Sequence, residues 1–217
     1  MHALLQPIVV KRAVVAGTLS GLACVPRLHL WADRMWPVWY LVALLFCAAF
    51  ILWAFVFAWH TELAGRDPLT PSANIVHWLA ATAWGGTYAV LAHTVLDPKL
   101  RAFAPAEFPT GIGDWLADML VALAFGRLFL LFGPVAFFGR LFHSVAAAVV
   151  LTACFNGFVL VLNASRLGLP AELVLVMLPT RVVASLVNAV FYVKGGVWTV
   201  VWISLLVQQR HLWQLCG

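Results

Sequence analysis

Three arginines stand inside long apolar stretches of this sequence, and any chemistry has to be argued from them first. Arg127 and Arg140 lie in the stretch 115–163, and Arg181 lies in the stretch 171–209. A guanidinium does not deprotonate in proteins, so it cannot lower its burial cost by becoming neutral. At membrane depth it costs at least about 2.5–3.5 kcal/mol on an insertion scale. Such arginines are therefore candidates for function, although one near a helix end can extend its charge to the interface.

Few carboxylates are available to neutralise these arginines within the same stretches. Asp118 and Glu172 are the acidic residues there, and both stand close to segment ends. The sequence therefore predicts that the carboxylate partner of Arg140 belongs to another chain. It also favours a headgroup position for Arg127 over one for Arg140.

The composition is that of a polytopic membrane protein. Of 217 residues, 64% are hydrophobic and 10% charged, and the mean hydropathy is +0.99. A soluble domain of this size does not require so much apolar sequence. The net charge of +5 is scattered over short loops, which favours contact with membrane lipids and argues against nucleic-acid binding. The four cysteines show no CxxC spacing, and neither a metal nor a cofactor is expected.

We expect a single integral-membrane domain over residues 1–217. Its predicted parts are a short N-terminal helix and loop over 1–35, two spanning helices over 36–96, a polar loop without regular structure over 97–114, and long apolar stretches over 115–163 and 171–209. The first helix is expected to end near Pro26, and the Gly85-Gly86 pair to let another helix approach closely. Hydropathy allows four upright spans in the last two stretches, or two long, tilted helices that form a hairpin. We predict the hairpin, which gives an all-α protein of about five to six helices.

Four short segments occur in an order that resembles a known family. They are LTPS at 69–72, FAP at 103–105 followed by Pro109 and Gly111, PVAFFGRL at 134–141 and VNAVF at 187–191. Over roughly residues 36–193 they resemble the proline-threonine turn, the proline-glycine loop, the segment with the essential arginine and the last-helix segment of the a subunit of F-type ATP synthases. The tripeptide Arg-Leu-Phe occurs twice, at Arg127 and at Arg140. Arg140 is chosen because Pro134 precedes it by the spacing of the family.

The resemblance implies a proton-translocating subunit of the Fo motor. The chain, which is no enzyme by itself, would provide two proton half-channels for proton transport coupled to ATP synthesis, and its last two helices would pack against the rotor ring. Arg140 would face the carboxylates of the c-ring subunits, and further partners would be other Fo and peripheral-stalk subunits and membrane lipids. The implied location is the mitochondrial inner membrane, with the bacterial plasma membrane as the alternative.

Polar residues of the apolar stretches are the candidates for the proton path. They are His143, Ser144, Asn188, Arg181, Asn156, Glu172, Asp118 and His77. His143 and Ser144 are expected one helical turn from Arg140 on the same side, and Asn188 is expected to face Arg140 across the hairpin. The sequence departs from the family where Ser144 stands for an asparagine, Arg181 for a glutamate and Asn188 for a glutamine.

Two other classes of function stay open at this point. A structural scaffold subunit of another membrane complex predicts that the buried arginines pair with lipid phosphates or partner loops. An intramembrane enzyme is suggested weakly by VKGGVW at 193–198, which resembles the last segments of CAAX-type membrane proteases. Those enzymes need a Glu-Glu pair and two intramembrane histidines on adjacent helices, and no such set occurs here.

Overall fold

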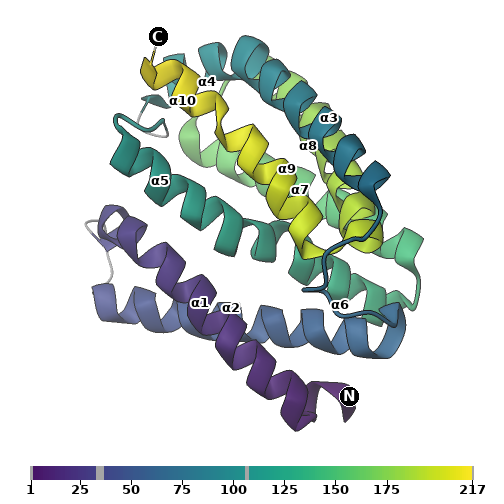
Figure 1. The fold of residues 1–217 in the computed structure, drawn as a ribbon. Helices are drawn as coiled ribbons and strands as arrows, with labels where there is room; N and C mark the ends of the chain where they lie inside the picture. Colours follow the sequence, from purple (N-terminus) through teal and green to yellow (C-terminus); the bar gives the residue numbers. More distant parts are fainter. Residues whose placement is uncertain (1, 33–36, 106–107, 217) are drawn as a thin grey trace.

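The chain folds into a bundle of helices, shown in Figure 1. The structure is a computed structural model that describes residues 2–32, 37–105 and 108–216. It is 88% helical, and no strand occurs among the residues described, so the predicted all-α class is confirmed. Five helices are long and apolar enough to cross a membrane, which makes the chain a multi-pass membrane protein. These spans are Pro7–Leu28, Val38–Leu63, Ile112–Phe142, Val145–Leu167 and Ala171–Gly195.

The N-terminal helix is longer than predicted. After a short 3₁₀ turn, His2–Leu5, helix α1 runs over Pro7–Ala32 and packs along α2, Val38–Trp59. The expected end near Pro26 is wrong, because α1 continues through Pro26 to Ala32, and apolar helices of membrane proteins tolerate an interior proline. Buried residues on the opposite side of α1, Cys24 and Leu28, pack against α2.

The next helix forms as expected, but helical structure continues after it into residues that were predicted to form a loop. Helix α3, Ile75–Leu91, packs against α9, Val197–Gln208, and a Cβ at Gly85 would lie only 3.0 Å from the Leu206 side chain of α9, so the expected close approach is confirmed at that glycine. α3 is not among the five helices that qualify as spans. A π-helical segment, Ala92–Leu96, leads into α4, Asp97–Phe103. The expectation of no regular structure over 97–114 is therefore wrong, because Pro98 stands in the first turn of α4, where no backbone N–H is needed.

The stretch 115–163 is divided into two helices. α5, Ile112–Val121, continues through the π-helical segments Ala122–Gly126 and Leu128–Phe132 into α6, Gly133–Phe142. α7, Val145–Leu167, then begins anew. The helix breaks because His143 adopts the left-handed conformation (φ 50°), and because the Ser144 hydroxyl accepts the Ala147 N–H as an N-cap.

The stretch 171–209 is divided as well. α8, Ala171–Gly195, packs against α7, and α9, Val197–Gln208, and α10, Arg210–Cys216, follow it. Gly196 separates α8 from α9 with a φ of 81°, which side-chain-bearing residues rarely adopt. The Val197 N–H then donates to the Pro68 carbonyl. The predicted hairpin of two uninterrupted long helices is thus not observed, and the two stretches contain three of the five candidate spans.

The bundle has two ends, which we name after the helices found there. At the α6 end lie the loop 65–74, the break at His143 and Gly196. At the α10 end, α4, α10 and the start of α5 come together, as seen at the upper left of Figure 1. A functional residue can therefore be located by its depth between these ends.

Candidate functional site

Arg140 lies at the α6 end of the bundle and has a carboxylate partner within this chain. Its Nη1 atom is 2.7 Å from Oε2 of Glu62, and the two side chains are 14% and 32% exposed. Glu62 belongs to the π-helical segment His60–Ala64 that follows α2. The expectation of a partner from another chain overlooked Glu62, because that residue stands outside the long apolar stretches.

The neighbours expected to act with Arg140 lie beyond the end of its helix. α6 ends at Phe142, so His143 and Ser144 do not continue the helical face of Arg140, and the predicted i+3 and i+4 arrangement is wrong. His143 is exposed, and Ser144 caps α7. Both residues shape the break between two helices.

Other polar groups at the α6 end are also satisfied by the chain itself. The His60 ring bonds the Arg66 carbonyl through Nδ1 and the Tyr192 hydroxyl through Nε2, both at 3.0 Å. Arg66 donates to the Lys194 carbonyl at 2.7 Å. These bonds hold the loop after α2 against the end of α8.

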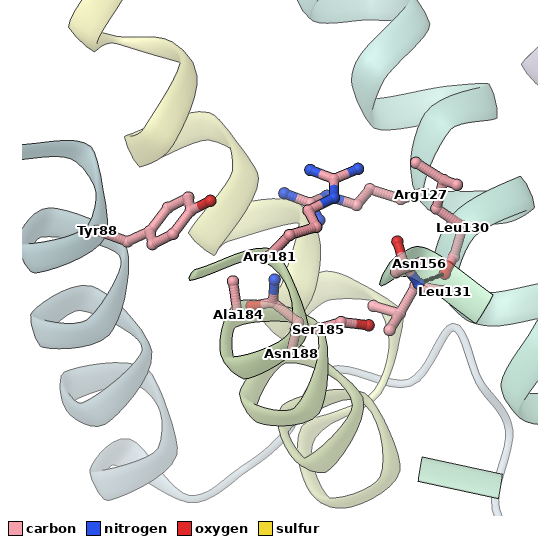
Figure 2. A pocket seen from close by; sticks show the side chains of 9 residues that line it. All are labelled: Tyr88, Arg127, Leu130, Leu131, Asn156, Arg181, Ala184, Ser185 and Asn188. Carbon is pink, nitrogen blue, oxygen red and sulfur yellow. Dashed lines mark hydrogen bonds between the residues drawn. The ribbon is translucent and has the colours of Figure 1, made fainter. Parts of the chain in front are cut away.

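The strongest candidate site lies deeper, around Arg127 and Arg181. Arg127 is the midpoint of the 31-residue span Ile112–Phe142, and Arg181 lies in the interior of the 25-residue helix α8. The expected depths are therefore reversed, since Arg140 is close to a helix end and Arg127 is not. Both arginines line one internal cavity, drawn in Figure 2.

The inner part of this cavity is small and polar. Its free space is about 20 Å³, enough for about one water molecule. Its polar lining residues besides the two arginines are Tyr88, Asn156, Ser185 and Asn188, which Figure 2 shows around the arginines. No acidic residue is among the described lining residues, so the two positive charges face each other without a carboxylate.

The backbone around Arg127 is unusual. Arg127 stands between the two π-helical segments, a geometry that occurs frequently at functional sites. Its Nε atom donates to Oγ of Ser204 in α9 at 2.6 Å. That bond fixes the side chain and leaves both terminal nitrogens of the guanidinium available to a ligand.

Asn156 and Asn188 have structural partners at the rim of the cavity. The Asn156 amide donates to the Leu130 carbonyl at 2.6 Å. The usual helical donor for that carbonyl would be the N–H of residue 134, which is a proline and has none. Asn188 accepts from Trp84 Nε1 at 3.2 Å and lies by the Arg127 cavity, which Arg140 does not line.

Ser185 offers a polar group without a partner. Its side chain is 6% exposed, and its hydroxyl is buried without a hydrogen bond. It stands one helical turn after Arg181 on α8, so both side chains lie on the same face. A ligand in the cavity could satisfy this hydroxyl.

A second, larger pocket towards the α10 end shares Tyr88, Arg127, Leu130 and Arg181 with the first, and we call the two the inner and outer parts of the cavity. The outer part has a volume of about 260 Å³ and is lined by the charged residues Arg127, Arg181, Arg210 and Asp97, by the polar residues Tyr88, Asn163 and Gln208, and by apolar side chains. Nε of Arg210 is 3.0 Å from a carboxylate oxygen of Asp97, so this pair partly neutralises itself. The chain thus has a polar chamber that leads from its middle towards one end.

The remaining predicted residues lie elsewhere. Asp118 is paired with Arg27 at 2.6 Å, Glu172 is exposed in the first turn of α8, and His77 bonds Ser72 at the start of α3. The structure therefore brings Asn156, Arg181 and Asn188 together, and they surround Arg127 and not Arg140. No group of residues able to hold a metal occurs in the described part of the chain.

Sequence reasoning missed several residues that line this cavity or hold Arg127. Tyr88, Ser185, Ser204 and Arg210 carry no motif, and only the packing of distant helices brings them to Arg127. The sequence does contain a signal for the depth of Arg127. Ser144 precedes an apolar run, and a serine in that position favours the start of a new helix. A break there makes Arg127 the centre of a span.

Comparison of the chain with known protein families, curated proteins and solved structures gives no match. The function must therefore be argued from the cavity.

Proposed function

We propose that this chain is a non-enzymatic, multi-pass membrane protein that binds an anionic group inside its helical bundle, at Arg127 and Arg181. One observation carries the proposal: two arginines at the depth of the spans line one cavity whose described inner lining has no acidic residue. A scaffold subunit of a membrane complex, whose buried arginines pair with lipid phosphates, is compatible with this activity.

The energetic argument rests on the cost of the two charges. Each guanidinium at the centre of a membrane costs at least about 2.5–3.5 kcal/mol, and like charges in one cavity repel in addition. An ion pair, such as that of Arg140 with Glu62, reduces this cost. At Arg127 and Arg181 a bound anion would do so.

The proposal is tested by thermal unfolding of the purified chain in a neutral detergent at constant ionic strength. Phosphate, sulfate and acetate, each compared with chloride, should raise the unfolding temperature to different extents if an anion site exists. The double variant Arg127→Gln and Arg181→Gln should abolish the response. Arg166→Gln, at an exposed arginine in the last turn of α7, is the control and should retain it. If no anion stabilises the wild type beyond chloride, the proposal is wrong.

The a subunit of an F-type ATP synthase is the second candidate, with a location in the mitochondrial inner membrane. The observation that favours it is the position of Arg127, which begins a second Arg-Leu-Phe tripeptide at mid-span, whereas Arg140 is paired with Glu62. In this version Arg127 would be the arginine that faces the ring. Against it, the Arg127 side chain is bonded to Ser204 inside the bundle.

ATP-driven proton pumping in native membranes distinguishes the two candidates. As a subunit of the Fo motor, a chain with Arg127→Ala or Arg140→Ala should lose pumping while soluble ATP hydrolysis continues. Pumping that survives both substitutions excludes the second candidate and leaves the first untouched.

A further inference from the structure

We infer that the ligand of the arginine cavity is the dianionic phosphate group of a phosphomonoester, an inference that rests on the function proposed above. The charge of the outer cavity is the first argument. Three arginines and one aspartate are its charged described lining residues, which gives a formal charge of +2. A phosphomonoester carries about −1.5 to −2 near neutral pH and neutralises that charge. A carboxylate or a phosphodiester carries a single negative charge and leaves about half of the cavity's positive charge uncompensated.

The arrangement of the donors is the second argument. Arg127, Arg181 and Arg210 come from three different elements, the helix 112–142, α8 and α10, so their guanidinium groups approach the cavity from separate directions. A tetrahedral phosphate has oxygens on several sides, and each can accept from a guanidinium. A planar carboxylate presents two oxygens on one side only.

Unsatisfied donors around the cavity point the same way. Arg127 uses Nε for Ser204, which leaves its terminal nitrogens for the ligand. The Ser185 hydroxyl, buried without a hydrogen bond, lies at the inner part and can donate to a further phosphate oxygen. The inner part has room for about one water molecule only, so the phosphate belongs in the outer part, and Ser185, which lines the inner part, is reached through that water.

The outer cavity also accommodates the group that carries the phosphate. Its volume is about 260 Å³, and its walls include apolar residues from several helices: Leu96, Leu130, Leu160, Met177 and Val207. Two sources share the chemistry of the ligand: a soluble phosphomonoester, including inorganic phosphate, and a phosphomonoester lipid such as phosphatidic acid.

Thermal unfolding of the full chain in neutral detergent tests the inference with named probes. They are inorganic phosphate, glycerol 3-phosphate, short-chain phosphatidic acid, phosphatidylglycerol of the same chain length, and acetate. The phosphomonoesters should stabilise the wild type at concentrations at least tenfold lower than their phosphodiester or carboxylate counterparts. If phosphatidic acid acts at least tenfold below glycerol 3-phosphate, the source is lipid, and otherwise it is soluble.

The outcomes separate this inference from the proposal on which it rests. Stabilisation by acetate or phosphatidylglycerol at the same concentrations as phosphomonoesters overturns the phosphomonoester assignment and leaves anion binding intact. No stabilisation by any probe overturns both. Native mass spectrometry of the complex with phosphatidic acid provides a second measurement that does not depend on stability.

The pH dependence of binding provides an independent test. The second pKa of a phosphomonoester is about 6, so its affinity should rise as the pH is raised from 5 to 7.5. The ionisable groups that face the ligand are Arg127, Arg181 and Arg210, Asp97 of α4 and Tyr88 of α3, and no histidine is among the described lining residues. Phosphatidylglycerol, which does not titrate in this range, is the control and should show no such rise.

A charge-removing variant completes the test. Arg181→Gln lowers the formal charge of the cavity to +1, so the preference for phosphatidic acid over phosphatidylglycerol should disappear. Arg166→Gln, at an exposed site of α7, should keep it. An unchanged preference in Arg181→Gln would contradict the role of charge matching.

Discussion

Arg127 and Arg140 begin the same tripeptide, Arg-Leu-Phe, in the same helix, yet their surroundings differ in every respect that matters for function. Arg140 is close to the end of the helix and is paired with Glu62 at 2.7 Å. Arg127 stands at the middle of the span, between π-helical segments, and shares a cavity with Arg181. Local sequence therefore does not determine what an intramembrane arginine does; its depth and its partner do.

The comparison predicts that removing charge raises the free energy of unfolding at Arg127 and Arg181 and lowers it at Arg140. Without a ligand, the double variant Arg127→Leu and Arg181→Leu should be more stable than the wild type by at least about 1–4 kcal/mol, the gain often found when even a paired buried charge is replaced by apolar residues. The free energy of unfolding from denaturation in mixed micelles is the measurement. The variant should also lose all response to phosphate.

A smaller loss is expected at Asn156. Asn156→Leu removes a donor to the Leu130 carbonyl, for which Pro134 has no N–H to offer as an α-helical partner, and should cost about 1–3 kcal/mol. The same unfolding measurement applies. Asn163→Leu, an exposed position on the same helix and at the outer cavity, is the matched control and should change stability by less than about 0.5 kcal/mol.

The pair at the α6 end should contribute about 1 kcal/mol. Its side chains are partly exposed, so its coupling should lie between the values for surface and buried pairs. A double-mutant cycle of Arg140→Gln and Glu62→Gln measures this coupling directly. A coupling near zero would remove the contrast with Arg127, because Arg140 would then also be an uncompensated charge.

The smallest effect is expected at the helix break. Ser144→Ala removes the N-cap of α7 and should cost about 0.5–1 kcal/mol, near the lower end of the range for caps. Ser144→Asp, which preserves the cap, should retain most of the stability. Phosphate binding should be unchanged in both variants, since Ser144 does not line the cavity.

Much of the architecture could be predicted from the sequence. The apolar stretches indicate spanning helices directly, because a membrane leaves no other partner for backbone polar groups. The interruptions at His143 and Gly196 were not predicted, since they depend on one left-handed residue and one glycine within apolar sequence. Pro26 was expected to end a helix and does not, because α1 accommodates it and continues to Ala32.

The candidate site was harder to predict. Asn156, Arg181 and Asn188 were recognised as polar residues in apolar surroundings, which is a signal that a single sequence contains. Their common neighbour Arg127 was assigned to the headgroups, because its depth depends on where the helix breaks. The contribution of Glu62 to Arg140 could not be predicted, since that contact joins the end of α2 to the end of α6.

The two π-helical segments have a consequence for the tolerance of this chain to insertions and deletions. Each segment bonds residues five apart and so absorbs one residue more than an α-helix of the same rise would. In an uninterrupted α-helix every extra residue would rotate the remainder of the helix by about 100°. At Gly139 an added side chain would collide with Trp59, so that face of α6 cannot turn freely. A chain one residue shorter between Leu128 and Phe132 could therefore keep both Arg127 and Gly139 on their present faces with ordinary α-helical geometry.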